Sequence, residues 1–208
     1  MKKWIIIISV ALCFCTLSCK KEKNENSYCV NVIYNSPTIT ALSESEMEVV
    51  KYLFNLNQLD YTKYQFTRFE EDEFGHHIRC NQFVNNLIIF YGDLIFHFDK
   101  NDSYYSLSGD LVNTINLNTT FSTKQDYVVE KFIDLVKHDE MINYKDIIYE
   151  CFEIEFGYYD LNDVTSTDPH FVKAWKITPA NKEYPVAYLN DETSGVIYYF
   201  DGIMYFDK

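Results

Sequence analysis

Residues 77–109 constrain the fold most, because runs of β-branched and aromatic residues alternate there with short polar breaks. The breaks fall at 85–86, at Gly92 and at 100–102, and the last extended run stops at Gly109. Strand-forming runs separated by Asn, Asp and Gly are typical of an antiparallel meander. The sequence therefore predicts three or four consecutive strands in this region.

Two segments have the pattern of amphipathic helices, one before the meander and one after it. Residues 43–46 form the capping box Ser-x-x-Glu, and apolar residues then recur at helical spacing to about Leu56. A second N-cap pattern at 122–126 precedes an apolar stripe, and this helix should end near His138.

Further extended segments and an acidic turn complete the pattern. We expect a strand at 61–69, a solvated acidic turn at 70–75, strands at 147–159 and 171–177, and a hairpin over 186–200. Phe171, Trp175 and Ile177 share one face of their strand, and we expect Trp175 in the core of the second unit. The fold class is therefore α+β, with two helix-plus-antiparallel-sheet units in tandem. The expected division is a leader at 1–18, a flexible tether at 19–36, a first unit at 37–118 and a second unit at 119–208.

Composition excludes one broad class of function. Hydrophobic residues make up 47% of the chain and aromatic residues 17%, which is typical of a packed globular protein. The formal net charge is −13, and an acidic surface repels phosphate backbones. We therefore expect no nucleic-acid partner.

The N-terminus has the organisation of an export signal. A basic start at 1–3 precedes the apolar run 4–14, and Leu17-Ser18-Cys19 follows at cleavage distance. This arrangement resembles a bacterial lipoprotein signal peptide, which implies cleavage before Cys19 and acylation of its thiol. The alternative, an uncleaved anchor, requires about 20 apolar residues. The expected location is the bacterial cell envelope, with the lipid in the outer membrane of a Gram-negative cell.

Three cysteines remain beyond Cys19, namely Cys29, Cys80 and Cys151. Export would place them in an oxidising compartment, where an odd number cannot all pair within one chain. We expect one disulfide and one buried thiol, and the sequence leaves all three pairings open. No Cys/His spacing suggests a metal site.

The meander also carries a family resemblance. Its positions are His77, Arg79, Gln82, Gly92, His97 and Gly109. At this spacing they resemble the propeptide motif found upstream of fungalysin and thermolysin-type metallopeptidases. The second unit resembles the PepSY module through Ala174-Trp175 and through Asp191 with Gly195.

The resemblance implies a role in protein interaction. In such precursors these units cover and chaperone the catalytic domain, and the zinc-binding pattern His-Glu-x-x-His is absent from this sequence. We expect a lipid-anchored, non-catalytic module that docks, inhibits or assists folding of a secreted thermolysin-like metallopeptidase. The alternative is an envelope sensor or structural lipoprotein that uses the same fold for unrelated contacts.

Candidate chemical residues have structural explanations that we favour. For His77, Arg79, Gln82 and His97 we expect cross-strand hydrogen bonds that fix the sheet, although His77 and Gln82 lie on opposite faces unless a bulge intervenes. The acidic run 70–73 lacks the ligand spacing of a calcium loop. No nucleophile elbow is present. We therefore expect no catalytic residue, no metal and no cofactor.

Overall fold

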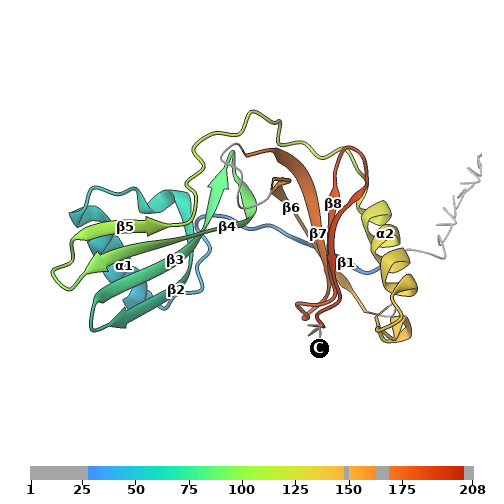
Figure 1. Cartoon of the computed structure of the whole chain (residues 1–208), viewed down its shortest axis with the longest axis horizontal. Coiled ribbons are helices and arrows are strands. Elements are labelled where there is room, and N and C mark those ends of the chain that lie inside the picture. The colour runs from blue at the N-terminus through green and yellow to red at the C-terminus, as the bar shows by residue number, and fades with distance from the viewer. Residues whose placement is uncertain (1–27, 148–149, 163–168, 204–208) are drawn as a thin grey trace, which may run out of the picture.

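The computed structural model describes residues 28–147, 150–162 and 169–203, and within them the chain is α+β (Figure 1). The helices are α1 (Glu44–Leu56) and α2 (Gln125–His138), with short 3₁₀ helices η1 (Tyr61–Lys63) and η2 (Tyr144–Asp146). The strands are β1 (Val30–Ile33), β2 (Tyr64–Asp72), β3 (Gly75–Val84), β4 (Leu87–Asp99), β5 (Tyr104–Ser108), β6 (Phe152–Asp160), β7 (Phe171–Pro179), β8 (Val186–Asn190) and β9 (Val196–Phe200).

Helix α1 and the meander form the first half of the molecule. The predicted capping box is confirmed, because Ser43 and Glu46 exchange side-chain and backbone hydrogen bonds at the start of α1. The fully buried Phe54 packs its ring 4.8 Å from that of Phe96 and 5.3 Å from that of Phe66. The apolar face of α1 therefore covers one face of β2–β5.

Two local predictions within the meander were wrong. Strand β2 continues to Asp72, so the turn is shorter than the predicted segment 70–75. Gly92 does not end a strand, because β4 runs through it and bulges between Ile88 and Asp93. The bulge leaves Tyr91 at a φ of +58°, a value that few non-glycine residues adopt. The expected three or four strands are thus three, β3, β4 and β5.

Helix α2 and strands β6–β9 form the second half. Trp175 is 1% exposed in a core that α2 covers with Val129, Phe132 and Val136, so its predicted core position is confirmed. The predicted N-cap was wrong: Lys124 is the N-cap of α2 and makes no side-chain capping bond. The strand expected from residue 147 begins at Phe152.

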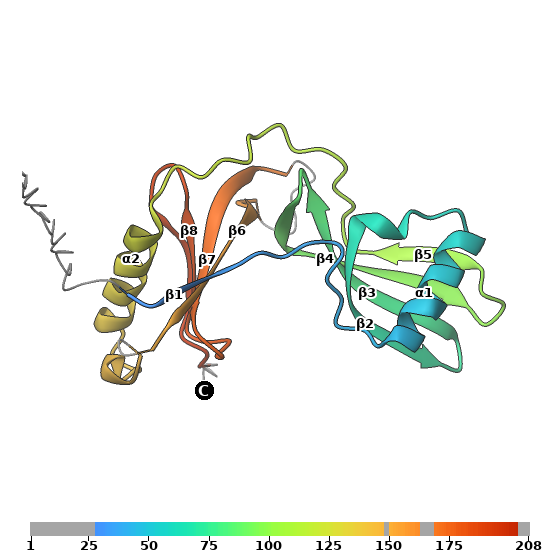
Figure 2. The same ribbon diagram turned by 180° about the vertical axis from the view of Figure 1, so that it is seen from behind.

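One nine-stranded sheet joins the two halves, in the order β2-β3-β4-β6-β7-β8-β9, with β5 on β4 and β1 on β6. The pairs β4–β6 and β1–β6 are parallel, so the sheet is mixed rather than two separate antiparallel sheets. The long strand β4 makes this connection. One of its edges pairs with β3, and the other pairs first with β6, at Ile88 and Ile89, and then with β5, from Ile95 to Phe98. The sheet curls between the halves, and the chain runs from β1 to α1 across the face that is in front in Figure 2.

Strand β1 lies inside the segment predicted to be a flexible tether, 19–36. Its residues alternate between half-buried and exposed, which suits an edge position on β6. A disulfide between Cys29 and Cys151 closes the start of this parallel pair and leaves Cys80 as a buried thiol. One disulfide and one buried thiol were expected, and the structure selects one of the three open pairings.

Candidate functional site

A row of polar side chains crosses strands β2, β3, β4 and β5. His77 and His97 are register partners on β3 and β4, and their Nδ1 atoms lie 2.7 Å apart. His97 Nε2 lies 2.9 Å from Ser108 Oγ on β5, and His77 Nε2 lies 3.3 Å from the carboxylate of Asp72 on β2. Asp72, His77, His97 and Ser108 therefore link β2, β3, β4 and β5 in one chain of contacts.

The contact between two Nδ1 atoms requires one proton between them. If Nδ1 of His77 donates to Nδ1 of His97, then the single N–H of a neutral His97 is at Nε2, and it donates to Ser108. Partial burial, together with the charge of His77, lowers the pKa of His97. The row thus favours a neutral His97 as the acceptor from His77.

Arg79 lies on the same face of β3 as His77 and forms an ion pair with Asp93 of β4 at 3.5 Å. The side chains of Arg79 and Asp93 are 47% and 51% exposed, so the pair adds little to stability. Both charged groups remain accessible to another molecule.

Gln82 lies on the opposite face and is 2% exposed. Its Nε2 donates to the carbonyl oxygens of Gly92 at 3.0 Å and Asp110 at 2.8 Å, while its Oε1 accepts from the backbone N–H of Val112 at 2.9 Å. One side chain thereby ties the β4 bulge to the segment that follows β5. The buried amide has no unused donor in this arrangement.

The two motif glycines allow this close packing. At Gly109, φ is +93° and an added Cβ would lie 2.3 Å from the carbonyl oxygen of Asp93. At Gly92, an added Cβ would lie 2.7 Å from Cγ2 of Ile89. The contacts of His77, Gln82 and His97 agree with the structural role that was predicted for them.

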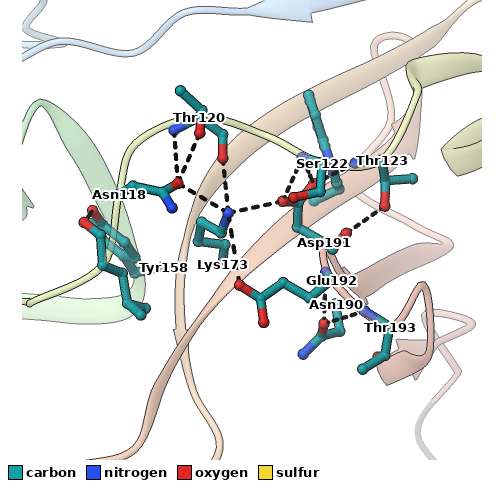
Figure 3. Close-up of polar contacts among 12 residues, drawn as sticks. Asn118, Thr120, Ser122, Thr123, Tyr158, Lys173, Asn190, Asp191, Glu192 and Thr193 are labelled. Atoms are coloured by element: carbon teal, nitrogen blue, oxygen red, sulfur yellow. Dashed lines mark hydrogen bonds and ion pairs between the residues drawn. The ribbon is translucent and has the colours of Figure 1, made fainter.

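A second cluster centres on Asp191, which directly follows β8 and is fully buried (Figure 3). Its Oδ1 accepts from the indole Nε1 of Trp175 and from the backbone N–H of Thr123, both at 3.0 Å. The backbone N–H of Ser122 donates to both carboxylate oxygens, at 2.9 and 2.7 Å. The hydroxyl of Thr123 also donates to the carbonyl oxygen of Asp191 at 2.5 Å, so this side chain is engaged with Asp191 instead of capping α2.

Lys173 completes this cluster with its side chain only 3% exposed. Its Nζ lies 3.3 Å from Asp191 Oδ2 and donates to the carbonyl oxygen of Thr120 at 2.8 Å and to Asn118 Oδ1 at 3.2 Å (Figure 3). Together these contacts fasten the segment 118–123, which connects the two halves, onto β7 and the β8–β9 turn.

Sequence reasoning missed Lys173, although a signal was present. Lys173 falls in the same alternating set as Phe171, Trp175 and Ile177, which were assigned to the core face of their strand. A lysine in that set requires an acidic partner, and Asp191 was already singled out. The predicted Gly195 is exposed and makes no part of the cluster.

The part of the chain that the structure describes also bears on metal binding, on the acidic turn and on membrane-spanning helices. No group of His, Cys, Asp or Glu side chains there could hold a metal ion. Asp72 of the acidic run accepts hydrogen bonds from the backbone N–H groups of Phe74 and Gly75, which close the turn and lower the pKa of Asp72.

No helix among the residues that the structure describes between 28 and 203 is long and apolar enough to cross a membrane. Cys19 lies outside the described residues.

Comparison with known families supports the first half of the sequence-based resemblance. Residues 63–111 match the Fungalysin/Thermolysin Propeptide Motif. This range contains strands β2–β5 and all the motif positions from His77 to Gly109. A comparison with curated proteins found no match. Strands β2–β5, with the polar row and the Gln82 contacts, are therefore similar to the propeptide motif of fungalysin and thermolysin.

Proposed function

We propose that this chain is a lipid-anchored, non-catalytic interaction module that docks a secreted thermolysin-like metallopeptidase. The observation that carries the proposal is the match of residues 63–111 to a peptidase propeptide motif. In this region the polar side chains that could take part in a reaction are His77, His97 and Gln82. All three make hydrogen bonds within the sheet. Such contacts suit a rigid binding surface better than an active site, because a catalytic group must be available to substrate.

The finer architecture supports a resemblance to a tandem propeptide. Helix α1 with β2–β5 is one helix-plus-antiparallel group, and α2 with β6–β9 is another. We propose that the second group corresponds to a PepSY-like module, with Trp175 and Asp191 as its core positions. Their hydrogen bond supports this assignment, because it joins the two residues on which the resemblance rests.

The docking surface that we favour is the face of β2–β5 opposite α1. Side chains alternate between the faces of a strand, so Ile78 and Leu94 face α1 while His77, Arg79 and Asp93 face away from it. The half-exposed Arg79 offers a cation that can pair with a carboxylate on the partner. Elsewhere the net charge of −13 favours a basic peptidase surface and association that weakens with salt.

The membrane location rests on the lipoprotein-like leader. We propose that Cys19 is acylated and holds the module at the outer membrane, where anchoring raises its effective concentration near exported peptidases. Changing Cys19→Ala should leave an unprocessed precursor that loses stable membrane association. Cleavage of that variant before residue 19, with continued partitioning into detergent, would contradict the anchor.

The docking proposal is tested with the purified chain as bait in a native secretome. Any retained peptidase is then assayed for activity and for refolding yield with and without the chain. We expect a metallopeptidase to be recovered and its activity or refolding to change. Inhibition, folding assistance and simple docking are distinguished by which of the two readouts moves.

Two charge reversals, one on the proposed docking face and one on the exposed side of α1, form a test and its matched control. Arg79→Glu should weaken recovery, since it places a second acid beside Asp93 on the proposed surface. Lys51→Glu changes the charge equally on the exposed side of α1 and should leave recovery unchanged. Repeated recovery of envelope proteins without any peptidase would favour the alternative, a sensor or structural lipoprotein.

A further inference from the structure

The edge of β6 contains a gap where its neighbouring strand changes. Strand β1 pairs with β6 from Phe152 to Glu155, and β4 pairs with the same strand at Gly157 and Tyr158. Phe156 therefore lies between the end of one neighbour and the start of the next. A cavity of about 200 Å³ occupies this gap.

The wall of the cavity is mainly apolar. Its apolar lining includes Ile33 from β1, Leu87 from β4, Phe156 from β6, Trp175 from β7 and Phe121 from the connecting segment. An apolar cavity of about 150 Å³ is large enough to hold benzene. The cavity at the β6 gap can therefore hold one aromatic ring with a short substituent.

A buried carboxylate also lines the cavity. Glu155 is 7% exposed, and the side-chain amide of Asn35, another lining residue, donates to its Oε1. A chain of amides leads to this point from the first half, because Asn81 donates to Gln65 at 3.0 Å and Gln65 donates to Asn35 at 3.3 Å. Each donor points toward Glu155, so the chain ends at an acceptor.

Among the described residues, the hydrogen bond that this carboxylate accepts comes from Asn35 and goes to Oε1, which leaves Oε2 available to a ligand. Lys176 is the register partner of Glu155 on β7, and its charge acts on the carboxylate. Burial raises the pKa of Glu155 more than the Asn35 bond and the charge of Lys176 lower it. The burial of this carboxylate outweighs the effect of Lys176, so a cation that reaches Oε2 would further stabilise its charged form.

We propose that the cavity at the β6 gap binds a small organic ammonium ion with a compact aromatic or aliphatic body. The ammonium group donates to Glu155 Oε2, and the apolar body lies against Phe156 and Trp175. A neutral compound of the same shape gains only the apolar contact, and an anion is repelled by the carboxylate. This site is independent of the docking face proposed for β2–β5.

Trp175 supplies a direct signal for binding. The sequence has two tryptophans, Trp4 and Trp175, so the full chain with Trp4→Phe reports from the cavity wall alone. Benzylamine is titrated into this protein at mildly alkaline pH, which favours the carboxylate form of Glu155 while benzylamine remains an ammonium ion. We expect saturable change of the emission and a rise of the melting temperature with ligand concentration.

Ligands of equal size and variants on the same strand separate the contribution of the Glu155 charge from that of the apolar contact. Benzyl alcohol and phenylacetate should bind at least about tenfold more weakly than benzylamine, which corresponds to about 1.4 kcal/mol. Glu155→Gln keeps an acceptor for Asn35 and should weaken the binding of benzylamine by a similar factor. Glu153→Gln, two residues earlier on β6 and outside the cavity, should leave the affinity unchanged.

A second variant covers the case in which Glu155→Gln does not fold. Ile33→Phe adds volume to a lining position that is 36% exposed, and it should abolish benzylamine binding while Glu155 is intact. The proposal is overturned if benzylamine does not bind, if benzyl alcohol binds equally well, or if folded Glu155→Gln keeps the original affinity.

Discussion

The ammonium group of Lys173 lies 3.3 Å from the carboxylate of Asp191, with the two side chains 3% and 0% exposed. The pair holds the segment that connects the two halves of the sheet, because Asp191 also accepts the backbone N–H groups of Ser122 and Thr123. A buried ion pair is stabilising only when additional hydrogen bonds satisfy both groups. Here Trp175 supplies one such bond to Asp191, and Thr120 accepts one from Lys173.

Removing Asp191 should therefore destabilise the protein strongly. Asp191→Ala leaves Lys173 buried without its countercharge, and we expect the free energy of unfolding to fall by about 3–5 kcal/mol. Urea denaturation followed by circular dichroism measures the loss. Glu192→Ala is the control, since Glu192 is 67% exposed and 3.8 Å from the same ammonium group, and it should change stability by less than about 1 kcal/mol. Similar losses in both variants would show that the buried pair is not the reason.

Trp175 should be indispensable to the second half. Its ring centre lies 4.8 Å from that of Phe156 and 5.4 Å from that of Phe121, and its indole N–H is bound by Asp191. We expect Trp175→Ala to cost about 3–5 kcal/mol, measured as a fall in the melting temperature. Trp175→Phe retains most of the ring contacts but leaves Asp191 without this donor, so its cost should be smaller. An unchanged melting curve for Trp175→Ala contradicts the packing described for this residue.

The disulfide should stabilise the edge strand β1. Cys29 and Cys151 are 122 residues apart, and their bond closes a long loop in the unfolded chain. The double variant Cys29→Ser, Cys151→Ser should lose about 2–5 kcal/mol of stability relative to the oxidised protein. Dithiothreitol should lower the melting temperature of the original protein and leave that of the double variant unchanged. A double variant as stable as the oxidised protein would argue against a stabilising disulfide.

Acid should weaken the protein through the histidine row. Because the pKa of His97 is lowered in the folded state, the unfolded chain binds more protons just below its own histidine pKa of about 6.5. The stability that His97 contributes is present above that pH and is lost as the pH falls through the lowered value. Denaturation curves from about pH 7.5 to about pH 5 should show this loss.

His97→Asn removes the titrating ring and should flatten this pH dependence. His170→Asn is the matched control, because His170 is exposed at the end of a loop and its side chain has no part in the row. Equal slopes for the original protein and the His97 variant would mean that other groups cause the acid sensitivity.

Several elements followed from the sequence alone because their determinants are local. The capping box at Ser43 and Glu46 lies within four residues, and it placed the start of α1 correctly. Alternation of apolar residues placed Trp175 in the core, and turn residues placed the reversal after β3. The match of residues 63–111 likewise depends on spacing within a single meander.

Other features were decided only by the tertiary structure, since they depend on groups far apart in sequence. Strand β4 pairs with β3 on both sides of its bulge, while its other edge pairs with β6 at Ile88 and Ile89 and with β5 from Ile95, and no local pattern encodes that change of neighbour. Strand β1 forms inside a predicted tether because the same edge of β6 is free to receive it. Ser122 and Thr123 have the sequence of a helix cap, yet their N–H groups bind Asp191, about 70 residues away, because a buried carboxylate needs donors that only the folded chain can bring to it.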